Sequence, residues 1–164
     1  IVDSLVGSEM CIRDRIYQDM GSLIIEKLLE NKVELFVDET IKEDFSNLNL
    51  ANESHYETEF LDLKLAVKVV DSVDQAIEHI KVYSSGHTEA ILTESKEVAD
   101  TFAKSIDSSV IFINSSTRFT DGEMFGFGSE IGISTQKLHV RGPMGLEALT
   151  NERYVVTGEG TVRG

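Results

Sequence analysis

Four consecutive side chains, Ser115, Ser116, Thr117 and Arg118, carry the most distinctive chemistry in the sequence. Hydroxyl groups donate or accept hydrogen bonds, and a guanidinium fork can bind a carboxylate or a phosphate through two parallel bonds. These residues follow the apolar run Val110–Ile113, which has the length and polar borders of a buried strand. Binding residues often lie where such a strand ends. The group therefore predicts an anion-binding loop, with an ordinary solvated loop as the alternative.

Strands and helices are expected to alternate in the segment that leads to this loop. Residues 60–70 predict a strand with one apolar face and one mixed face. The apolar face is formed by Leu61, Leu63, Leu65, Val67 and Val69, and the mixed face carries Asp62, Lys64 and Lys68 together with Phe60, Ala66 and Val70. The elements expected after it are a helix with a capping box at Ser72 and Gln75, a strand over 88–93, a helix capped by Ser95, and the strand over 110–113. Each helical connection is long enough for a right-handed crossover, so these strands should lie parallel in one α/β sheet with flanking helices.

The two ends of the chain complete the expected fold. Residues 17–30 predict an amphipathic helix with these residues inward: Met20, Leu23, Ile24 and Leu28. The elements expected next are a short strand over 33–37, a brief helix with a capping box at Thr40 and Glu43, and an irregular surface loop over 46–57. Residues 152–163 carry apolar runs on both sides of Gly158–Gly160, and they predict a β-hairpin arm.

Composition narrows the classes of function. The chain has 164 residues, of which 41% are hydrophobic, so it can form one packed domain or a part of a larger one. No apolar run approaches the roughly 20 residues of a membrane-spanning helix, so we expect no membrane partner. A net charge of −14 without any basic run argues against nucleic acid. The single cysteine fits a reducing compartment, so a cytoplasmic location is expected.

The acidic charge is concentrated away from the candidate loop. Residues 108–164 carry five basic and six acidic side chains, so almost all of the net charge of −14 lies in residues 1–107. An anionic ligand would therefore meet less repulsion in the C-terminal third, which agrees with an anion site there.

Several nearly ungapped segments carry a family resemblance. They are NSSTRFTDG at 114–122, FGFG at 125–128, EIGISTQKLH at 130–139, RGPMGL at 141–146 and, upstream, TEFLDL at 58–63 and GHTEAI at 86–91. These segments resemble the C-terminal part of glutamate-5-semialdehyde dehydrogenases. That family is also called the γ-glutamyl phosphate reductases and belongs to the aldehyde dehydrogenase superfamily. The resemblance covers residues 16–164, and the loop at 116–122 disfavours an aldehyde dehydrogenase with a different substrate.

The resemblance implies an enzyme of proline biosynthesis that reduces L-glutamyl 5-phosphate with NADPH to L-glutamate 5-semialdehyde and phosphate. A cysteine thiolate would attack the acyl carbon and expel phosphate, and hydride would then reduce the thioester and release the aldehyde. Residues 16–150 would form part of the α/β catalytic domain. Residues 151–164 would form an oligomerisation arm that pairs with another subunit, which makes a homo-oligomer the expected assembly.

Site residues are carried over from the same resemblance. Ser116, Thr117, Arg118, Phe119 and Thr120 match the loop that lines the substrate tunnel in the superfamily. Arg118 is the expected partner of the substrate's α-carboxylate or phosphate, and the alternative is a surface salt bridge to Asp121 or Glu123.

A second pair, Glu59 and Phe60, matches a superfamily segment that contacts the nicotinamide ribose. Thr58 could occupy the glutamate's place if the register differs by one position. A carboxylate can accept both ribose hydroxyls, and the alternative for Glu59 is a solvated residue at the start of a strand. His87 and His139 lack the spacing of metal ligands, so no metal site is expected.

Two parts of the expected enzyme are not found in the sequence. No glycine-rich turn has the spacing and context of a dinucleotide-binding fingerprint. Cys11 lies in residues 1–15, which resemble nothing in the family and are interpreted as an artefactual segment outside the fold. No catalytic residue is therefore assigned in this chain. We expect a fragment that is inactive alone, and the alternative is a non-catalytic oligomerisation or binding module derived from the same fold.

Overall fold

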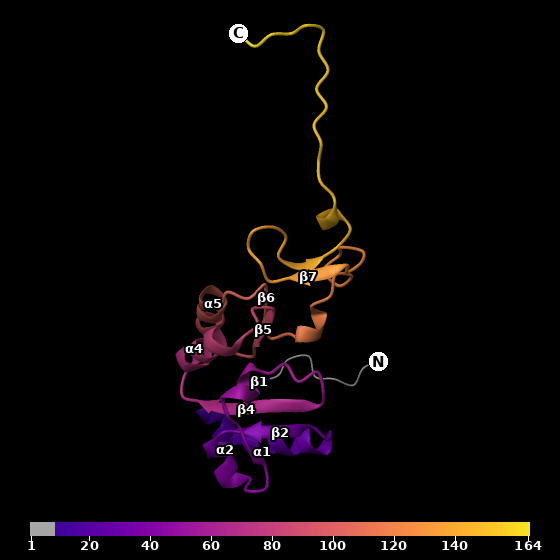
Figure 1. Cartoon of the computed structure of the whole chain (residues 1–164). Helices are drawn as coiled ribbons and strands as arrows, with labels where there is room; N and C mark the ends of the chain where they lie inside the picture. The colour runs from indigo at the N-terminus through magenta and orange to yellow at the C-terminus, as the bar shows by residue number, and fades with distance from the viewer. Residues whose placement is uncertain (1–8) are drawn as a thin grey trace. The chain divides into compact units, whose positions relative to one another are not determined.

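The structure is a computed structural model that describes residues 9–164. It divides into two compact units that meet between Arg118 and Phe119. The first unit holds two parallel sheets with their helices, and the second holds a small antiparallel hairpin and an extended end. Figure 1 shows α1 and α2 beside β2, and α4 and α5 beside β5 and β6.

The larger sheet of the first unit has the strand order β1-β4-β2-β3, and every neighbouring pair is parallel. Its strands are β1 (Glu9–Arg13), β2 (Glu34–Val37), β3 (Asn49–Leu50) and β4 (Lys64–Val70). β4 lies between β1 and β2 in the sheet, and its consecutive residues Leu65, Ala66 and Val67, which point to opposite faces, are all buried, so both faces of β4 are covered. The strand is shorter than the predicted 60–70, because it begins at Lys64. Leu61 lies before the strand, with a φ of 49°.

Residues 9–13 do not lie outside the fold, contrary to the expectation for residues 1–15. They form β1, which pairs with β4 from Glu9↔Ala66 to Arg13↔Val70, and Ile12 is buried. The same expectation for residues 1–8 concerns residues that lie outside the described part of the chain. A short segment with three consecutive apolar residues, Met10, Cys11 and Ile12, can pair with a central strand whatever family its sequence resembles.

Helix α1 (Asp14–Glu30) confirms the predicted helix but not all of its inward face. Tyr17, Gly21 and Ile25 are buried, whereas Met20 and Leu23 are exposed. The remaining predicted residues, Ile24 and Leu28, pack partly buried against the core. Gly21 is required where it is because a Cβ there would lie 2.3 Å from Cδ2 of Tyr17, whose hydroxyl donates to Asp44 at 2.8 Å.

Asp38 joins the end of β2 to both α2 (Glu39–Asp44) and β4. Its Oδ1 accepts from the backbone N–H of Ile41, so Asp38 is the N-cap of α2, not the predicted Thr40. Its Oδ2 accepts from the N–H of Val69 at 2.7 Å, beyond the last residue of β2. One carboxylate thus continues the sheet and starts the helix. The predicted loop over 46–57 holds β3 and α3 (Glu53–Glu57) instead, the latter capped by Asn52 and His55.

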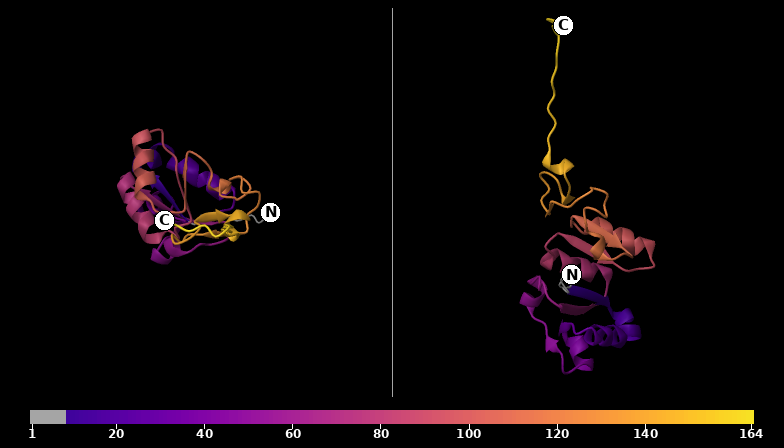
Figure 2. Two further views of the ribbon diagram at one scale, coloured as in Figure 1. Left: turned by 90° about the horizontal axis from the view of Figure 1, so that it is seen from above. Right: turned by 90° about the vertical axis from the view of Figure 1, so that its right-hand side faces the viewer.

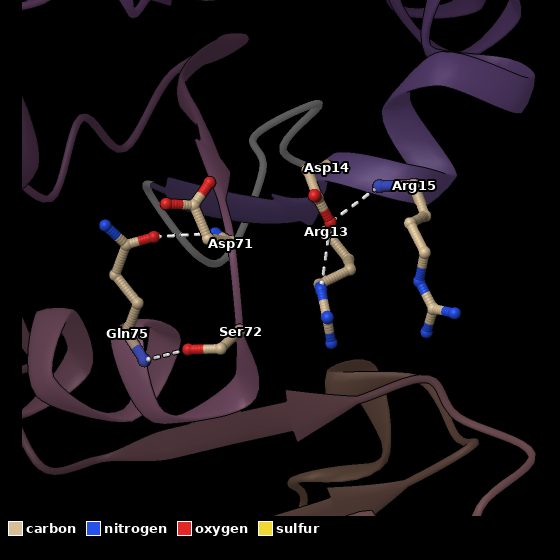
Figure 3. A network of polar contacts seen from close by, with 6 residues as sticks. All are labelled: Arg13, Asp14, Arg15, Asp71, Ser72 and Gln75. Carbon is tan, nitrogen blue, oxygen red and sulfur yellow. Dashed lines mark hydrogen bonds and ion pairs between the residues drawn. The ribbon is translucent and has the colours of Figure 1, made fainter.

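Helix α4 (Val73–Tyr83) begins with the predicted cap, and Figure 3 shows its contacts. Ser72 Oγ accepts from the N–H of Gln75 at 3.1 Å, while Gln75 Oε1 accepts from Asp71 N at 2.7 Å. The same figure shows Asp14 Oδ1 accepting from Arg13 Nε and from the N–H of Arg15 at the start of α1. Ser72 thus caps α4, whereas the N-cap Arg13 of α1 makes no side-chain cap bond and Asp14 accepts from one amide of the first turn.

The second sheet of the first unit contains only β5 (Thr88–Ile91) and β6 (Val110–Ile113). They pair in parallel through the crossover helix α5 (Lys96–Ser105), which Ser95 caps as predicted. The strands and helices of this segment are confirmed, but their placement in one continuous sheet is wrong, because β4 pairs with β1 and β2. Gly86, between α4 and β5, has a φ of 73°, which lies in the left-handed region that favours glycine.

The second unit holds the antiparallel pair β7 (Gly132–Ser134) and β8 (Gly142–Met144). Pro143 in β8 is the partner of Ile133 in β7. Proline has no N–H to donate, and it is tolerated here because both strands of a two-stranded sheet are edge strands. Short 3₁₀ turns, η1 (Thr117–Phe119) and η2 (Glu147–Leu149), precede and follow this hairpin. An antiparallel hairpin is thus present in this part of the chain, but not at the predicted residues 152–163.

Residues 151–164 form neither helix nor strand, and all of them are exposed (Figure 2). A two-stranded ribbon without a third strand or a covering surface is marginal in water, which explains why the predicted arm does not pair with itself. The α/β class with parallel strands and flanking helices is confirmed. Among residues 9–164, no helix is long and apolar enough to cross a bilayer.

Candidate functional site

The candidate loop leaves the sheet at Asn114, directly after β6. The backbone N–H of Asn114 donates to the carbonyl of Ile91 at 2.8 Å, and its φ of 54° turns the chain away from the strand. Its side-chain amide then forms two further bonds to β5's continuation: Oδ1 accepts from Thr93 N, and Nδ2 donates to Thr93 O, both at 2.8 Å. The start of the loop is thereby fixed to both strands.

The predicted substrate residues of the first unit lie directly after this point. Ser116 Oγ accepts from the backbone N–H of Arg118 at 3.2 Å, which closes a short turn around Thr117. Arg118 is exposed, and among residues 9–118 no side chain forms an ion pair with its guanidinium. Ser116 and Arg118 thus lie in one turn just past the carboxyl end of a parallel strand, which is the usual position for ligand contacts in such sheets.

The other two residues of the predicted loop, Phe119 and Thr120, open the second unit. After them the chain forms a tight turn in which Asp121 Oδ1 accepts from the N–H groups of Glu123 and Met124. The N–H of Gly122 donates to Glu130 Oε2 at 3.0 Å, and a Cβ at Gly122 would lie 2.5 Å from the carbonyl oxygen of Ser129. Gly122 is therefore closely packed, whereas a Cβ at Gly126 or Gly128 would meet nothing within 4 Å. These glycines lie in a loop, as predicted.

The predicted cofactor residues lie between α3 and β4. Glu59 is exposed to solvent, so its carboxylate is accessible. The ring of Phe60 stacks on Phe36 with centroids 5.4 Å apart, and Phe36 stacks on His55 at 4.0 Å. These contacts hold Phe60 against the sheet while Glu59 faces water.

A cavity of about 260 Å³ lies elsewhere in the first unit. Its lining residues come from the segments that precede β5 and β6: Ile80, Lys81, Ser84, Ser85, Gly86, Ile106, Asp107 and Ser108. It contains none of the predicted site residues, and it lies at the amino ends of the two strands, opposite the Asn114 turn. We assign it no role.

One buried polar residue, His79, was not recognised from the sequence. His79 on α4 is buried, and its Nε2 lies 2.7 Å from Glu9 Oε2 while its Nδ1 lies 3.4 Å from Lys68 Nζ. An ammonium can only donate, so Nδ1 accepts and Nε2 carries the proton that Glu9 accepts. The rings of Tyr56 and Tyr83 lie against His79 with centroids 4.9 and 4.6 Å away. These bonds satisfy the histidine and tie α4 to the sheet, which is a structural role.

Comparisons with known proteins agree on one enzyme. No family model matches the chain. A gamma-glutamyl phosphate reductase from Thermoanaerobacter sp. (strain X514) is 49% identical over 152 residues, which is 93% of this chain and 37% of that protein. The same enzyme from Thermobifida fusca is 55% identical over 85% of this chain and 33% of its own length. A crystal structure of gamma-glutamyl phosphate reductase from Thermotoga maritima matches with a TM-score of 0.88 and 46% identity, covering 96% of this chain and 38% of that one.

The chain is homologous to gamma-glutamyl phosphate reductase. It spans little more than a third of the length of the curated gamma-glutamyl phosphate reductases that it matches, and it corresponds to their C-terminal part, as predicted from residues 16–164. A propionaldehyde dehydrogenase structure from Clostridium phytofermentans, 16% identical with a TM-score of 0.58 over 89% of this chain and 41% of that chain, shows the same fold. The aldehyde dehydrogenase-type architecture is thus confirmed.

Cys11 does not have the properties of the reductase nucleophile that the resemblance implies. Burial, reinforced by the negative charge of Glu9, raises the pKa of its thiol to about 12. A catalytic thiolate requires the opposite shift.

We therefore expect Cys11 to react slowly with iodoacetamide at pH 8 in the folded chain. Only the thiolate is nucleophilic, and a pKa near 12 leaves roughly one thiol in ten thousand ionised at that pH. Mass spectrometry would follow alkylation of the native chain and of the same chain in urea. The rate should rise at least a hundredfold on unfolding, and equal rates would show that the thiol is not shielded.

Proposed function

We propose that this chain is the C-terminal part of an NADPH-dependent reductase that converts L-glutamyl 5-phosphate to L-glutamate 5-semialdehyde and phosphate in proline biosynthesis. The observation that carries the proposal is the 49% identity to a gamma-glutamyl phosphate reductase over 93% of this chain, with a matching structure at a TM-score of 0.88. Because the chain spans only 37% of that relative, we further propose that it has no activity alone.

In this proposal the residues after β6 bind the substrate. Arg118 binds its α-carboxylate or its phosphate, and the side chains that assist are Ser116, Thr117, Phe119 and Thr120. Support comes from the turn that places the hydroxyl of Ser116 beside the backbone of Arg118, and from the exposure of Arg118 at the carboxyl end of β6. Such a cluster can share the charge of an oxyanion among several donors.

Glu59 and Phe60 are proposed to contact the ribose of the cofactor, which supplies the hydride when bound. The exposed carboxylate of Glu59 suits two ribose hydroxyls, and the packing of Phe60 on Phe36 fixes the segment that carries it. Most of the cofactor site, and the nucleophilic cysteine, would come from the part of the enzyme that this chain does not contain.

Residues 151–164 are proposed as an oligomerisation arm, and the enzyme as a cytoplasmic homo-oligomer. The segment is extended and exposed, and it contains the β-prone run Tyr154–Thr157, as strand addition to another subunit requires.

The test compares this chain with a full-length chimera in which residues 16–164 replace the corresponding segment of the Thermotoga maritima reductase. The reverse reaction is followed as phosphate-dependent reduction of NADP⁺ by glutamate 5-semialdehyde. We expect turnover by the chimera and none by the 164-residue chain. Turnover by the chain alone would refute the fragment assignment, and a folded but inactive chimera would argue against the reductase assignment.

A further inference from the structure

We infer that Asn114 is a positioning residue for the substrate loop: its side-chain amide replaces one acceptor and one donor of the β5–β6 ladder and so fixes the direction in which residues 115–118 leave the sheet. The inference rests on the proposed role of Arg118, which the loop carries. It concerns contacts inside the first unit only.

The register of the two strands shows what the amide replaces. Val110 N donates to His87 O and Asn114 N donates to Ile91 O, so β6 donates to β5 at every second residue. In a parallel ladder that continued, Thr93 N would next donate to the backbone carbonyl of Asn114. It donates instead to Asn114 Oδ1 at 2.8 Å, and Asn114 Nδ2 donates back to Thr93 O at the same distance.

The backbone conformation of Asn114 makes this exchange possible. Its φ of 54° lies in the left-handed region, which Asn adopts more readily than other residues with a Cβ. The backbone carbonyl is thereby turned away from Thr93, and the side-chain amide, which has the same donor and acceptor as a peptide, occupies its place. The chain can then leave the sheet at a sharp angle without leaving Thr93 unbonded.

Arg118 lies only four residues after Asn114, so the direction in which the chain leaves the sheet at Asn114 determines the position of Arg118. Only Ser115, Ser116 and Thr117 separate the two residues, and the bond from Arg118 N to Ser116 Oγ removes freedom from that short segment. A guanidinium must reach its anion with fork geometry, so a small change in direction at Asn114 would be carried to the contact.

The experiment uses the full-length chimera with three substitutions at this position. Asn114→Gly permits the positive φ but removes the amide, so it separates backbone conformation from the bonds to Thr93. Asn114→Asp keeps the acceptor for Thr93 N and loses the donor to Thr93 O. Asn114→Ala removes the amide and disfavours the φ. Arg118→Ala is the reference for complete loss of the anion contact.

We expect Asn114→Gly to raise the KM of the substrate that Arg118 binds at least tenfold, with the KM for NADP⁺ within twofold of the parent and the melting temperature nearly unchanged. Asn114→Asp should lie between the parent and Asn114→Gly. The double variant Asn114→Gly/Arg118→Ala should have a KM little higher than that of Arg118→Ala alone, because both substitutions remove the same contact with the substrate. Unchanged KM in Asn114→Gly, or full additivity with Arg118→Ala, would overturn the inference.

A second measurement separates this inference from the proposed function. Amide hydrogen exchange at Thr93 reports the bond to Asn114 Oδ1 directly, and protection there should be lost in Asn114→Gly. If Arg118→Ala leaves all kinetics unchanged, the proposed substrate role of the loop fails. If Arg118→Ala raises the KM while Asn114→Gly does not, only the positioning role fails.

Discussion

Replacing Arg118 by Ala in the full-length chimera is expected to raise the KM for one anionic substrate by roughly 10²- to 10³-fold. Removing one partner of a desolvated ion pair costs about 3–5 kcal/mol, and each 1.4 kcal/mol corresponds to a factor of ten in binding. The fold should be intact because Arg118 is exposed and forms no ion pair among residues 9–118.

The reverse reaction also tells which anion Arg118 binds, because phosphate and the glutamate semialdehyde are then separate substrates. A raised KM for phosphate would assign Arg118 to the phosphoryl group, and a raised KM for the aldehyde would assign it to the α-carboxylate. Arg118→Lys should recover only part of the loss, since an ammonium lacks the fork. Lys96→Ala, which removes an exposed cation at the start of α5, is the control for general charge effects. Parental KM values in Arg118→Ala would exclude it from the site.

Replacing Ile25 by Ala is expected to lower the free energy of unfolding of the 164-residue chain by about 2–5 kcal/mol. Ile25 on α1 is 0% exposed, so the substitution removes buried methyl groups and leaves a cavity that the core fills only in part. Leu23 on the same helix is 53% exposed, and Leu23→Ala should change stability by less than about 0.5 kcal/mol.

Urea unfolding followed by far-ultraviolet circular dichroism measures both variants under the same conditions. The two substitutions differ mainly in which side of α1 they alter. Equal losses of stability would show that α1 packs with a different face against the sheet than the structure describes.

The comparison of α1 with its prediction shows what periodicity can and cannot determine. The helix itself follows from apolar residues at helical spacing, but a wide apolar stripe allows several rotations about the axis. The rotation is set by Gly21, where only a missing side chain admits the ring of Tyr17, and by the bond from Tyr17 to Asp44. Both are contacts between residues whose proximity only the folded chain reveals.

The positions of the strands in the sequence were similarly predictable, but the pairing between strands was not. Alternation and crossover length indicate parallel strands at β4, β5 and β6, but pairing is a long-range property. Residues 9–13, which carry no family resemblance, take the place beside β4, and β5 pairs with β6 alone. The hairpin was expected at residues 152–163 because the glycines there resemble a turn, yet the pair formed at β7 and β8, where Gly145 packs tightly against Phe127.

The site residues stay predictions, and two polar residues that shape the segments after β2 and β6 were not recognised from the sequence. The resemblance supplied Ser116 to Thr120, Glu59 and Phe60, whereas Asp38 and Asn114 were not recognised. Each is a short polar residue directly after a strand, and each uses its side chain to bond the neighbouring strand. That position, with helical capping after Asp38 and a hydroxyl-rich loop after Asn114, is the signal by which both could have been found.

The two bonds of the Asn114 amide also bear on how the chain ages. Asparagine before a small residue such as Ser115 deamidates when the following backbone nitrogen attacks the side-chain carbonyl carbon, and asparagine is accordingly among the thermolabile residues. The bonds from Oδ1 and Nδ2 to Thr93 restrain this side chain, so we expect deamidation to be slower in the folded chain than in urea. Deamidation would remove the donor to the Thr93 carbonyl and keep the acceptor for its N–H.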